Sequence, residues 1–267
     1  MIGVASLAPF LGGALAFGGM AAALSGRREL LVRWCCWAVG VPLVVGAFWW
    51  GGPGVTALAL VVGVIAAMEF GGLMGLSRVD RAVLATAVSG AVLTSWLAPG
   101  HEVRAVAAGA LAIAAVPLLA GDCAHGLRRL MAGLLGLVWL SVLAALVTLG
   151  ETALVLFIAV SVGDIVAYFA GQRLGGPRLS PLSPAKRWSG TLSGAAAALG
   201  VLTALSALSP PMAVAVAVGA PAGDLLESMV KRGTQAKDSA HWLAGSGGLL
   251  DRIDSLLLAV AVLLLLR

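Results

Sequence analysis

The sequence predicts an all-α fold, a polytopic integral membrane protein in which about ten helices cross the bilayer. Three observations predict it. Of the 267 residues, 60% are apolar and only 11% are charged, whereas about a quarter of the residues in an ordinary soluble domain are charged. Apolar runs recur at lengths that can cross about 30 Å of hydrocarbon at about 1.5 Å per residue. Basic residues concentrate in alternate connections between those runs.

Hydropathy gives the expected spans in order. They cover residues 4–24, 32–50, 54–76, 82–98, 104–121, 130–149, 152–172, 190–208, 211–230 and 249–266. The fourth, fifth and last are the shortest, so nine crossings are the alternative. The first could be read as a secretory signal, but no Lys or Arg precedes its apolar run, and we expect a retained helix. Abundant Gly and Ala predict close packing between the helices.

Charge placement predicts the orientation. Basic residues of the odd-numbered connections are Arg27, Arg28, Arg33, Arg78, Arg81, Arg128, Arg129, Arg173, Arg178, Lys186, Arg187, Lys231, Arg232 and Lys237, while the even-numbered connections carry only Arg104. Since basic connections stay on the cytoplasmic side, we expect these loops inside and both termini outside. The net charge of +5 follows from the same bias, so it indicates no nucleic-acid partner.

The chain divides into two regions of different chemical content. Residues 1–150 predict a scaffold of transmembrane helices, and residues 151–267 predict the catalytic region. Glu69 is the exception in the first region, because an ionisable group inside a span should face protein or water. It could line the site or make a buried structural contact. Cys35, Cys36 and Cys123 lack metal-ligand spacing and are expected to be packing residues.

The second region opens with a polar helix and a basic loop. Asp164 lies inside an expected span, with Tyr168 one turn later on the same face. In the loop that follows, the prolines should stop the helix and fix extended backbone. Ser183, Lys186 and Arg187 supply a hydroxyl and two cations that could bind phosphates. An ordinary cytoplasmic loop of positive charge is the alternative interpretation.

Acidic residues then gather near the cytoplasmic end of the last two spans. Asp224 and Glu227 lie three apart, as do Asp251 and Asp254, so on helices each pair shares one face. An ion pair between Glu227 and Lys231 is the structural alternative for the first pair. Carboxylates that can hold a divalent cation, interleaved with phosphate-binding cations, favour phosphoryl or nucleotidyl transfer. His241 is as well explained by lining the loop as by catalysis.

These residues resemble the motif of the phosphatidate cytidylyltransferase family, the CDP-diacylglycerol synthases. The resemblance is carried by Ser228, Lys231, Arg232, Lys237, Asp238, Ser239, Gly247, Gly248, Asp251, Arg252, Ile253, Asp254 and Ser255, with Ser183, Pro184, Lys186, Trp188, Gly190, Asp164, Tyr168 and Gly171 upstream and a weaker match at Glu69 and Phe70. It is specific over about 160–255. Departures include Ser246 in place of the usual His and Ala244 in place of Pro, with Ala185, Arg187 and Ser189 where Lys, Thr and Glu are typical.

The resemblance implies that CTP and phosphatidate give CDP-diacylglycerol and pyrophosphate, with Mg2+ and a second cation, K+ or Mg2+. It implies catalytic roles for Lys231, Lys237, Asp238, Asp251, Arg252 and Asp254, and substrate contacts for Ser183, Pro184, Lys186, Arg187, Ser228, Arg232, Ser239, Gly247 and Gly248. The implied metal ligands are Asp224, Asp251 and Asp254, with Glu227 and Asp164 as further candidates. A bacterial plasma membrane, membrane lipid contacts and a homodimer also follow from it, and the basic connections predict a site that faces the cytoplasm.

Two other functions fit parts of the pattern. An enzyme acting on another lipid phosphate, such as an isoprenoid one, would use the same triphosphate machinery, because a motif underdetermines its substrate. An ion-coupled transporter would also use acidic residues within the membrane. Transporters usually have duplicated halves with midplane sites, whereas the acids here gather in one half, so the pattern favours the enzyme.

Overall fold

A computed structural model describes residues 4–26, 28–236, 238–240, 242 and 247–267. The predicted all-α fold is confirmed, with one small hairpin added to it. The helices are α1 (Val4–Leu24), α2 (Arg28–Trp49), α3 (Gly52–Leu73), α4 (Arg78–Leu97), α5 (Glu102–Leu119), α6 (Gly126–Leu140), α7 (Ala145–Leu149), α8 (Glu151–Leu174), α9 (Trp188–Ala204), α10 (Pro210–Val214), α11 (Ala220–Gly233) and α12 (Leu250–Leu265). Short helical links, η1 (Ser141–Ala144) and η2 (Ala215–Gly219), join α6 to α7 and α10 to α11, and the strands are β1 (Arg178–Ser180) and β2 (Ser183–Arg187).

The helices are those of a polytopic membrane protein. Within the described residues, six are long and apolar enough to cross a bilayer: Leu7–Leu24, Gly52–Leu73, Glu102–Leu119, Gly126–Leu149, Glu151–Leu174 and Pro210–Gly233. A shorter apolar helix covers Trp34–Trp49. Of the other expected spans, α9 and α12 have 17 and 16 residues, fewer than the roughly 20 that a typical crossing uses. The expected total of about ten crossings therefore stays a prediction.

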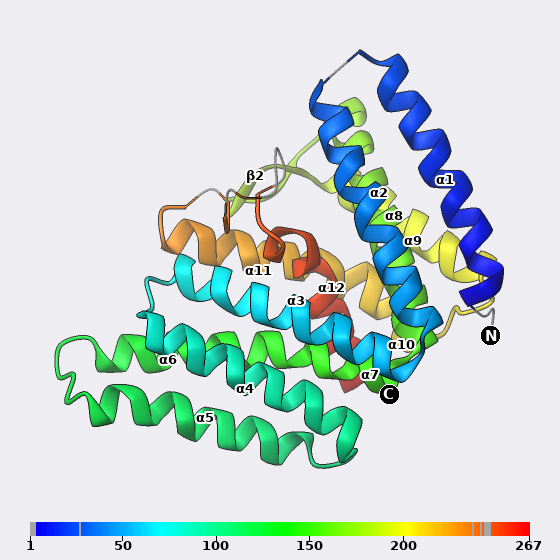
Figure 1. The fold of residues 1–267 in the computed structure, drawn as a ribbon. Helices are drawn as coiled ribbons and strands as arrows, with labels where there is room; N and C mark the ends of the chain where they lie inside the picture. Colours follow the sequence, from blue (N-terminus) through cyan, green and yellow to red (C-terminus); the bar gives the residue numbers. More distant parts are fainter. Residues whose placement is uncertain (1–3, 27, 237, 241, 243–246) are drawn as a thin grey trace.

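The connections alternate between two sides of the molecule. Figure 1 places the N and C ends on one side, together with the turns from α2 to α3 and from α7 to α8. The hairpin and the turns from α3 to α4 and from α5 to α6 lie on the opposite side. This second side carries the basic connections, so the charge pattern and the chain path agree. We call it the basic side below.

A local polar motif decides where α4 begins. The expected span begins at residue 82, and the helix that contains most of it begins one turn earlier, at Arg78. The Ser77 hydroxyl accepts from the Asp80 N–H at 3.2 Å, and the Asp80 carboxylate accepts from the Ser77 N–H at 3.1 Å. This capping box satisfies backbone donors that the first turn leaves free. Because Ser77 and Asp80 are polar, a hydropathy profile leaves them outside the apolar span.

Glycine contacts bring the helices of the second region together. A Cβ atom on Gly190 of α9 would lie 2.5 Å from the Ala167 carbonyl oxygen of α8, and one on Gly194 would lie 2.6 Å from that of Gly163. Between α11 and α12, a Cβ atom on Gly223 would lie 2.4 Å from the Asp254 carbonyl oxygen. Only glycine allows these backbone approaches. They hold the acidic helix faces close to one another.

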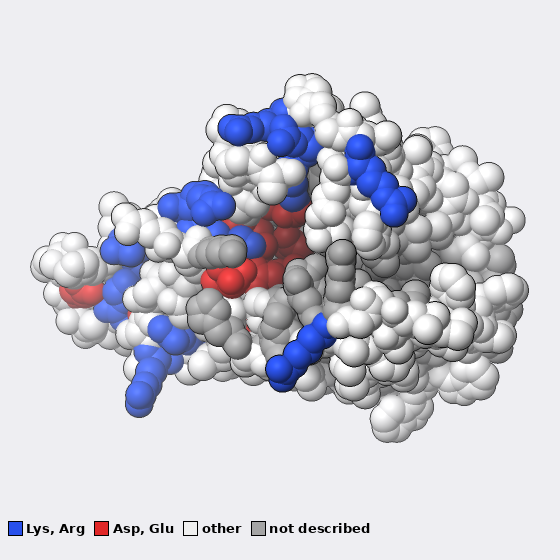
Figure 2. All heavy atoms as spheres, turned by 90° about the horizontal axis from the view of Figure 1, so that it is seen from above, with Lys and Arg blue, Asp and Glu red and all other residues white. Residues whose placement is uncertain are grey.

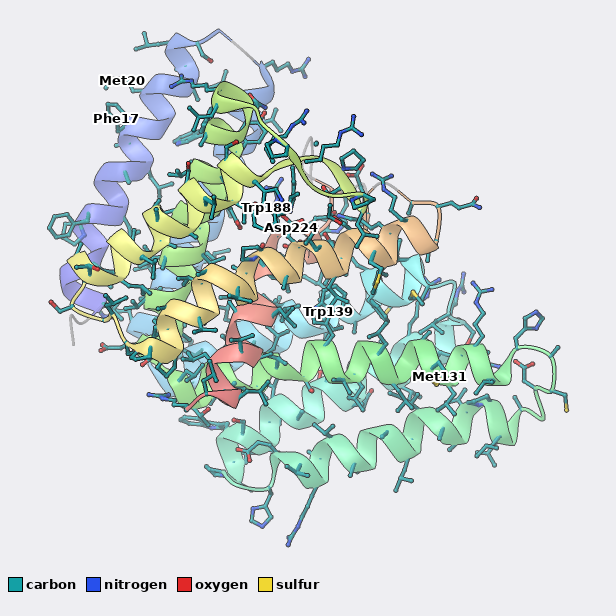
Figure 3. The ribbon with its side chains drawn as sticks, turned by 180° about the vertical axis from the view of Figure 1, so that it is seen from behind. Phe17, Met20, Met131, Trp139, Trp188 and Asp224 are labelled. Carbon is teal, nitrogen blue, oxygen red and sulfur yellow. The ribbon has the colours of Figure 1, made fainter. Side chains whose placement is uncertain are left out.

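Packing of the first region is mainly apolar. Phe70 of α3 and Trp139 of α6 meet edge to face, with ring centroids 6.1 Å apart, a favoured arrangement of two aromatic rings. Figure 3 shows Trp139 pointing into the bundle, whereas Phe17 and Met20 project outward from α1. Large exposed apolar side chains such as these suit a surface that faces lipid.

Candidate active site

One cavity collects the polar side chains of the second region. Its volume is about 520 Å3, and its wall comes from α8, the hairpin, α9, η2, α11 and α12. Viewed from the basic side, Figure 2 shows acidic side chains inside a hollow with Lys and Arg around it. Deeper in the wall are the apolar residues Val160, Ala198, Val216 and Ala220. The cavity therefore offers both charged and apolar surface to a ligand.

Five carboxylates line this cavity, and four of them are the two pairs that the spacing placed on shared helix faces. Asp164 comes from α8, Asp224 and Glu227 from α11, and Asp251 and Asp254 from the first turns of α12. Glu227 and Asp254 are almost fully buried, with 1% and 5% of their surface exposed. Figure 3 shows Asp224 on the side of α11 that faces the hairpin and Trp188. The two acidic pairs thus meet in one place.

Two lysines neutralise part of this negative charge. Lys231 Nζ lies 2.6 Å from Glu227 Oε2 and 2.8 Å from Asp251 Oδ1, so the ion pair expected within α11 extends to α12. Lys186, from β2, pairs with Asp224. Burial lowers the pKa of Lys186, while the carboxylates of Asp254 and Asp164 act in the opposite direction. Both amines therefore lie among acids, with 29% of the Lys186 side chain and 16% of the Lys231 side chain exposed.

The hairpin carries Lys186 over the cavity. Its strands are antiparallel, with Arg178 opposite Arg187 and Ser180 opposite Ser183. The guanidinium of Arg187 donates to the Gly176 carbonyl oxygen at 3.0 Å, which ties the end of β2 to the segment before β1. Pro181 and Pro184 predicted extended backbone here, and the structure confirms it for Pro184 in β2, whereas Pro181 lies in the turn between the strands. They did not predict the pairing of the two strands.

Asp251 is fixed by many donors. It accepts from Lys231 Nζ at 2.8 Å, from the Ser239 hydroxyl at 2.9 Å and from the Gly248 N–H at 2.7 Å. The Ser239 N–H also donates to it. A carboxylate with this many partners holds its neighbours in place. Asp251 therefore joins the segment before α12 to the lysine of α11.

The donor chemistry of the cavity fits a hard divalent cation. Glu227 Oε1 is buried without a hydrogen-bond partner, and an unpaired buried carboxylate oxygen is costly unless something positive binds it. Carboxylate oxygens are the ligands that Mg2+ takes in proteins. Among the residues that the structure describes, no three Asp, Glu, His or Cys side chains lie close enough to hold a metal as they stand. Lys231 Nζ lies between two of the acids, Glu227 and Asp251.

The structure brings many of the predicted site residues together. Those that line the cavity are Asp164, Ser183, Lys186, Arg187, Asp224, Glu227, Lys231, Asp251, Arg252 and Asp254. Those outside its wall are Pro184, Ser228, Arg232, Asp238, Ser239, Gly247 and Gly248. Of the second group, Ser239 and Gly248 contact Asp251, so they act on the cavity through that carboxylate. Lys237, His241, Ala244 and Ser246 fall outside the described residues.

Two polar residues of the wall were missed by the sequence prediction: Gln172 and Thr191. A signal existed for the first, since Gln172 follows Asp164 and Tyr168 at intervals of four and so shares their helix face. Ser255, which belongs to the motif that carries the family resemblance, also lines the wall and is 3% exposed. Thr191 lies in the first turns of α9, and only the packing of α9 on α8 brings it to the cavity.

All residues of the cavity wall lie in the part of the chain that matches a known protein family. The model of the cytidylyltransferase family matches residues 31–267. A phosphatidate cytidylyltransferase of Brucella abortus (strain 2308) is 46% identical over 123 residues, which are 43% of this chain and 46% of the relative. One from Pseudomonas aeruginosa is 40% identical over 155 residues, 51% of this chain and 55% of the relative. The chain therefore spans about half the length of the curated relatives that it matches.

Proposed function

The chain belongs to the cytidylyltransferase family, and from this premise we propose that it transfers CMP from CTP to phosphatidate, giving CDP-diacylglycerol and pyrophosphate. One observation carries the proposal beyond the family. A single cavity is lined by five carboxylates and by the cations Lys186, Arg187, Lys231 and Arg252, next to apolar wall. A triphosphate, a metal and a lipid phosphate need these three kinds of surface together.

In the proposed reaction, the substrate supplies its own nucleophile. A phosphate oxygen of phosphatidate forms a bond to the α-phosphorus of CTP, and the bond from that phosphorus to the oxygen bridging to the β-phosphate breaks. Pyrophosphate leaves with the electron pair of that bond. The protein needs no attacking Ser or Cys, so its task is to bring two anions together and to stabilise the charge of the leaving group.

The cations of the cavity suit that task. Lys186 and Lys231 lie among the carboxylates, and phosphate oxygens of CTP would draw their ammonium groups away from the acids. Arg252 lies on the same wall and offers a planar fork that matches phosphate geometry. The hairpin would position Lys186 above the triphosphate. These side chains would reduce the repulsion between CTP and the lipid phosphate before the reaction.

We place Mg2+ among Asp224, Glu227 and Asp254, with Asp164 nearby, because these acids line the cavity and Glu227 has an unpaired oxygen. Asp251, which the family resemblance implies as a metal ligand, would also orient Lys231, from which it accepts a hydrogen bond. When bound, Mg2+ would supply positive charge to the phosphate oxygens. A second cation, K+ or Mg2+, belongs to the proposal as well, because the family resemblance implies one.

The location of the cavity supports access for both substrates. CTP is soluble and cytoplasmic, so we propose that the basic side faces the cytoplasm of a bacterium and that the chain lies in its plasma membrane. The apolar part of the wall would receive the start of the acyl chains. The proposal also includes a homodimer, as the family resemblance implies.

Turnover of labelled CTP tests the proposal. The protein would be purified in detergent and supplied with Mg2+ and, in separate reactions, phosphatidate, an isoprenyl phosphate or no lipid. We expect pyrophosphate release and a CDP-lipid product with phosphatidate only. If only the isoprenyl phosphate gave a product, the proposed lipid substrate would be wrong, but the proposed type of reaction would be supported. No pyrophosphate with either lipid would contradict the proposed activity.

A further inference from the structure

Glu69 connects the first region of the chain to the segment that precedes α12. It lies near the end of α3 on the basic side, and only 8% of its surface is exposed. The carboxylate accepts hydrogen bonds from the Leu249 N–H at 2.9 Å, the Leu250 N–H at 2.7 Å, the Ser239 hydroxyl at 3.4 Å and the indole N–H of Trp242. Its partners are 170 to 181 residues further along the chain. Glu69 itself does not line the cavity.

The carboxylate of Glu69 caps α12 from another helix. The residue at the cap position, Leu249, has no side chain that can accept a hydrogen bond from the first turn. Backbone N–H groups of a first turn need acceptors, and a negative charge there also interacts favourably with the helix dipole. Glu69 meets both needs by accepting from Leu249 and Leu250. The start of α12 is therefore set by α3.

The same contacts lead into the cavity. The Ser239 hydroxyl lies between two carboxylates, 3.4 Å from Glu69 Oε2 and 2.9 Å from Asp251 Oδ2. Asp251 in turn holds Lys231. Gly248 lies against this network, because a Cβ atom there would meet both the Ser239 hydroxyl and the Glu69 carboxylate. This explains a glycine at a position that the sequence analysis had connected with substrate.

We propose that Glu69 is a positioning residue of the active site. By fixing the first turn of α12 it sets the directions of the Asp251 and Asp254 carboxylates, and through Asp251 it sets Lys231, without touching a substrate. The inference rests on the proposed function, since it is that reaction which the positioned groups would serve. It adds a residue from the region predicted as scaffold to the support of the site.

Two substitutions at matched carboxylates separate positioning from general stability. Glu69→Gln keeps the size of the side chain but removes its charge and one of its two acceptor oxygens. Asp80→Asn is the control, because Asp80 is also 8% exposed and is bonded to Ser77 and Arg129, away from α12. Amide hydrogen exchange of residues 247–252 and steady-state kinetics with CTP would be measured for both variants.

We expect Glu69→Gln to raise amide exchange in residues 247–252 by about tenfold or more while α8 and α11 keep their protection. We expect its kcat to fall by about tenfold, with a change in KM for CTP of less than about threefold, since misplaced groups act mainly on the reaction step. Asp80→Asn should change neither the exchange of this segment nor kcat. Unchanged exchange and unchanged kcat in Glu69→Gln would overturn the proposal, and so would an equal loss of protection in every helix.

A second variant keeps the inference testable if Glu69→Gln does not fold. Trp242→Phe removes one donor to Glu69 at a residue that is 56% exposed, and it should raise exchange in the same segment to a smaller extent. No rise would contradict the proposal. Hydrogen exchange needs no turnover, so it tests the contact even if no lipid phosphate proves to be a substrate. In that case the proposed activity would be wrong, while the proposed contact between Glu69 and α12 would still be tested.

Discussion

Two buried acidic sites, one in each region of the molecule, satisfy their charges in opposite ways. In the first region, Asp80 accepts from Arg129 through both oxygens at 2.9 Å, and Asp122 accepts from the same guanidinium at 2.8 Å. In the second region, five carboxylates share one cavity and Glu227 Oε1 has no partner. The first arrangement is complete without a ligand. The second leaves one buried carboxylate oxygen without a partner, which is the arrangement that the proposed cation site would need.

This comparison teaches that the partners of an acidic residue distinguish structure from function better than its burial does. Asp80 and Asp254 differ little in exposure, at 8% and 5%. Asp80 has an arginine and a capping serine, whereas Asp254 faces a cavity that contains four other acids. Substitution at the two positions should therefore affect different properties.

The largest effect is expected from Asp254→Asn. We expect kcat/KM for CTP to fall by about 1000-fold or more, because the substitution removes a carboxylate that we propose as a metal ligand. The Tm should stay the same or rise, since the change removes one negative charge from a crowded buried cluster. Asp80→Asn should show the reverse, a lower Tm with normal kcat/KM. The comparison would break if both substitutions lowered Tm and left activity intact.

A hairpin substitution sharpens the assignment of the cations. Lys186→Met should lower kcat/KM for CTP by about 100-fold, because the amine that pairs with Asp224 would no longer bind phosphate. Arg178→Met is the matched control, since Arg178 is an exposed residue of the same hairpin outside the cavity wall. It should leave kcat/KM within about twofold. Equal losses in the two variants would indicate that the whole hairpin matters and that Lys186 has no special role.

A pair of glycines tests the packing behind the site. Gly223→Ala should lower Tm by several degrees, because the new Cβ would lie 2.4 Å from the Asp254 carbonyl oxygen and push α11 from α12. Gly90→Ala in α4 should keep or slightly raise Tm, since no atom lies within 4 Å of its Cβ position and alanine favours helix. Thermal unfolding in detergent measures both. A Gly223→Ala protein as stable as the Gly90→Ala protein would contradict the close approach of these helices.

The smallest effect concerns pH in the first region. The hydrogen bond from Arg129 lowers the pKa of Asp122, with a further contribution from the His125 N–H. A carboxyl whose pKa is lowered on folding stabilises the protein above its unfolded pKa, and this is lost as pH falls through the folded value. Near pH 7, the Asp122→Asn protein should therefore have a slightly lower Tm than the wild-type protein. Below about pH 4, its Tm should fall slightly less steeply with pH than that of the wild-type protein. Identical acid profiles for the two proteins would contradict it.

Local patterns in the sequence predicted much of the fold. Apolar runs located the helices, and the basic connections predicted the two sides seen in Figure 1. Apolar runs do not show where polar groups extend a helix beyond the run, as in the capping box that starts α4 at Arg78. The strand pairing of 178–187 was also missed, because prolines predict extended backbone and give no partner for it.

For the site, helical spacing predicted that Asp224, Glu227, Asp251 and Asp254 share faces, and all four line the cavity. Spacing could not show that Asp251 is fixed by Ser239 and Gly248, because those contacts depend on the path of the intervening segment. It also could not connect Glu69 with Leu250, 181 residues away. Such contacts follow from tertiary packing, on which a single sequence carries no periodic signal.

Binding of Mn2+ to the purified protein, followed by electron paramagnetic resonance in the presence of CTP, tests the central claim most directly. Mn2+ stands in for Mg2+ because both prefer oxygen ligands in octahedral geometry. The account predicts saturable binding that Asp254→Asn and Glu227→Gln each weaken by about tenfold or more and that Asp80→Asn leaves unchanged. Equal Mn2+ binding by the wild-type protein and by the two cavity variants would contradict it.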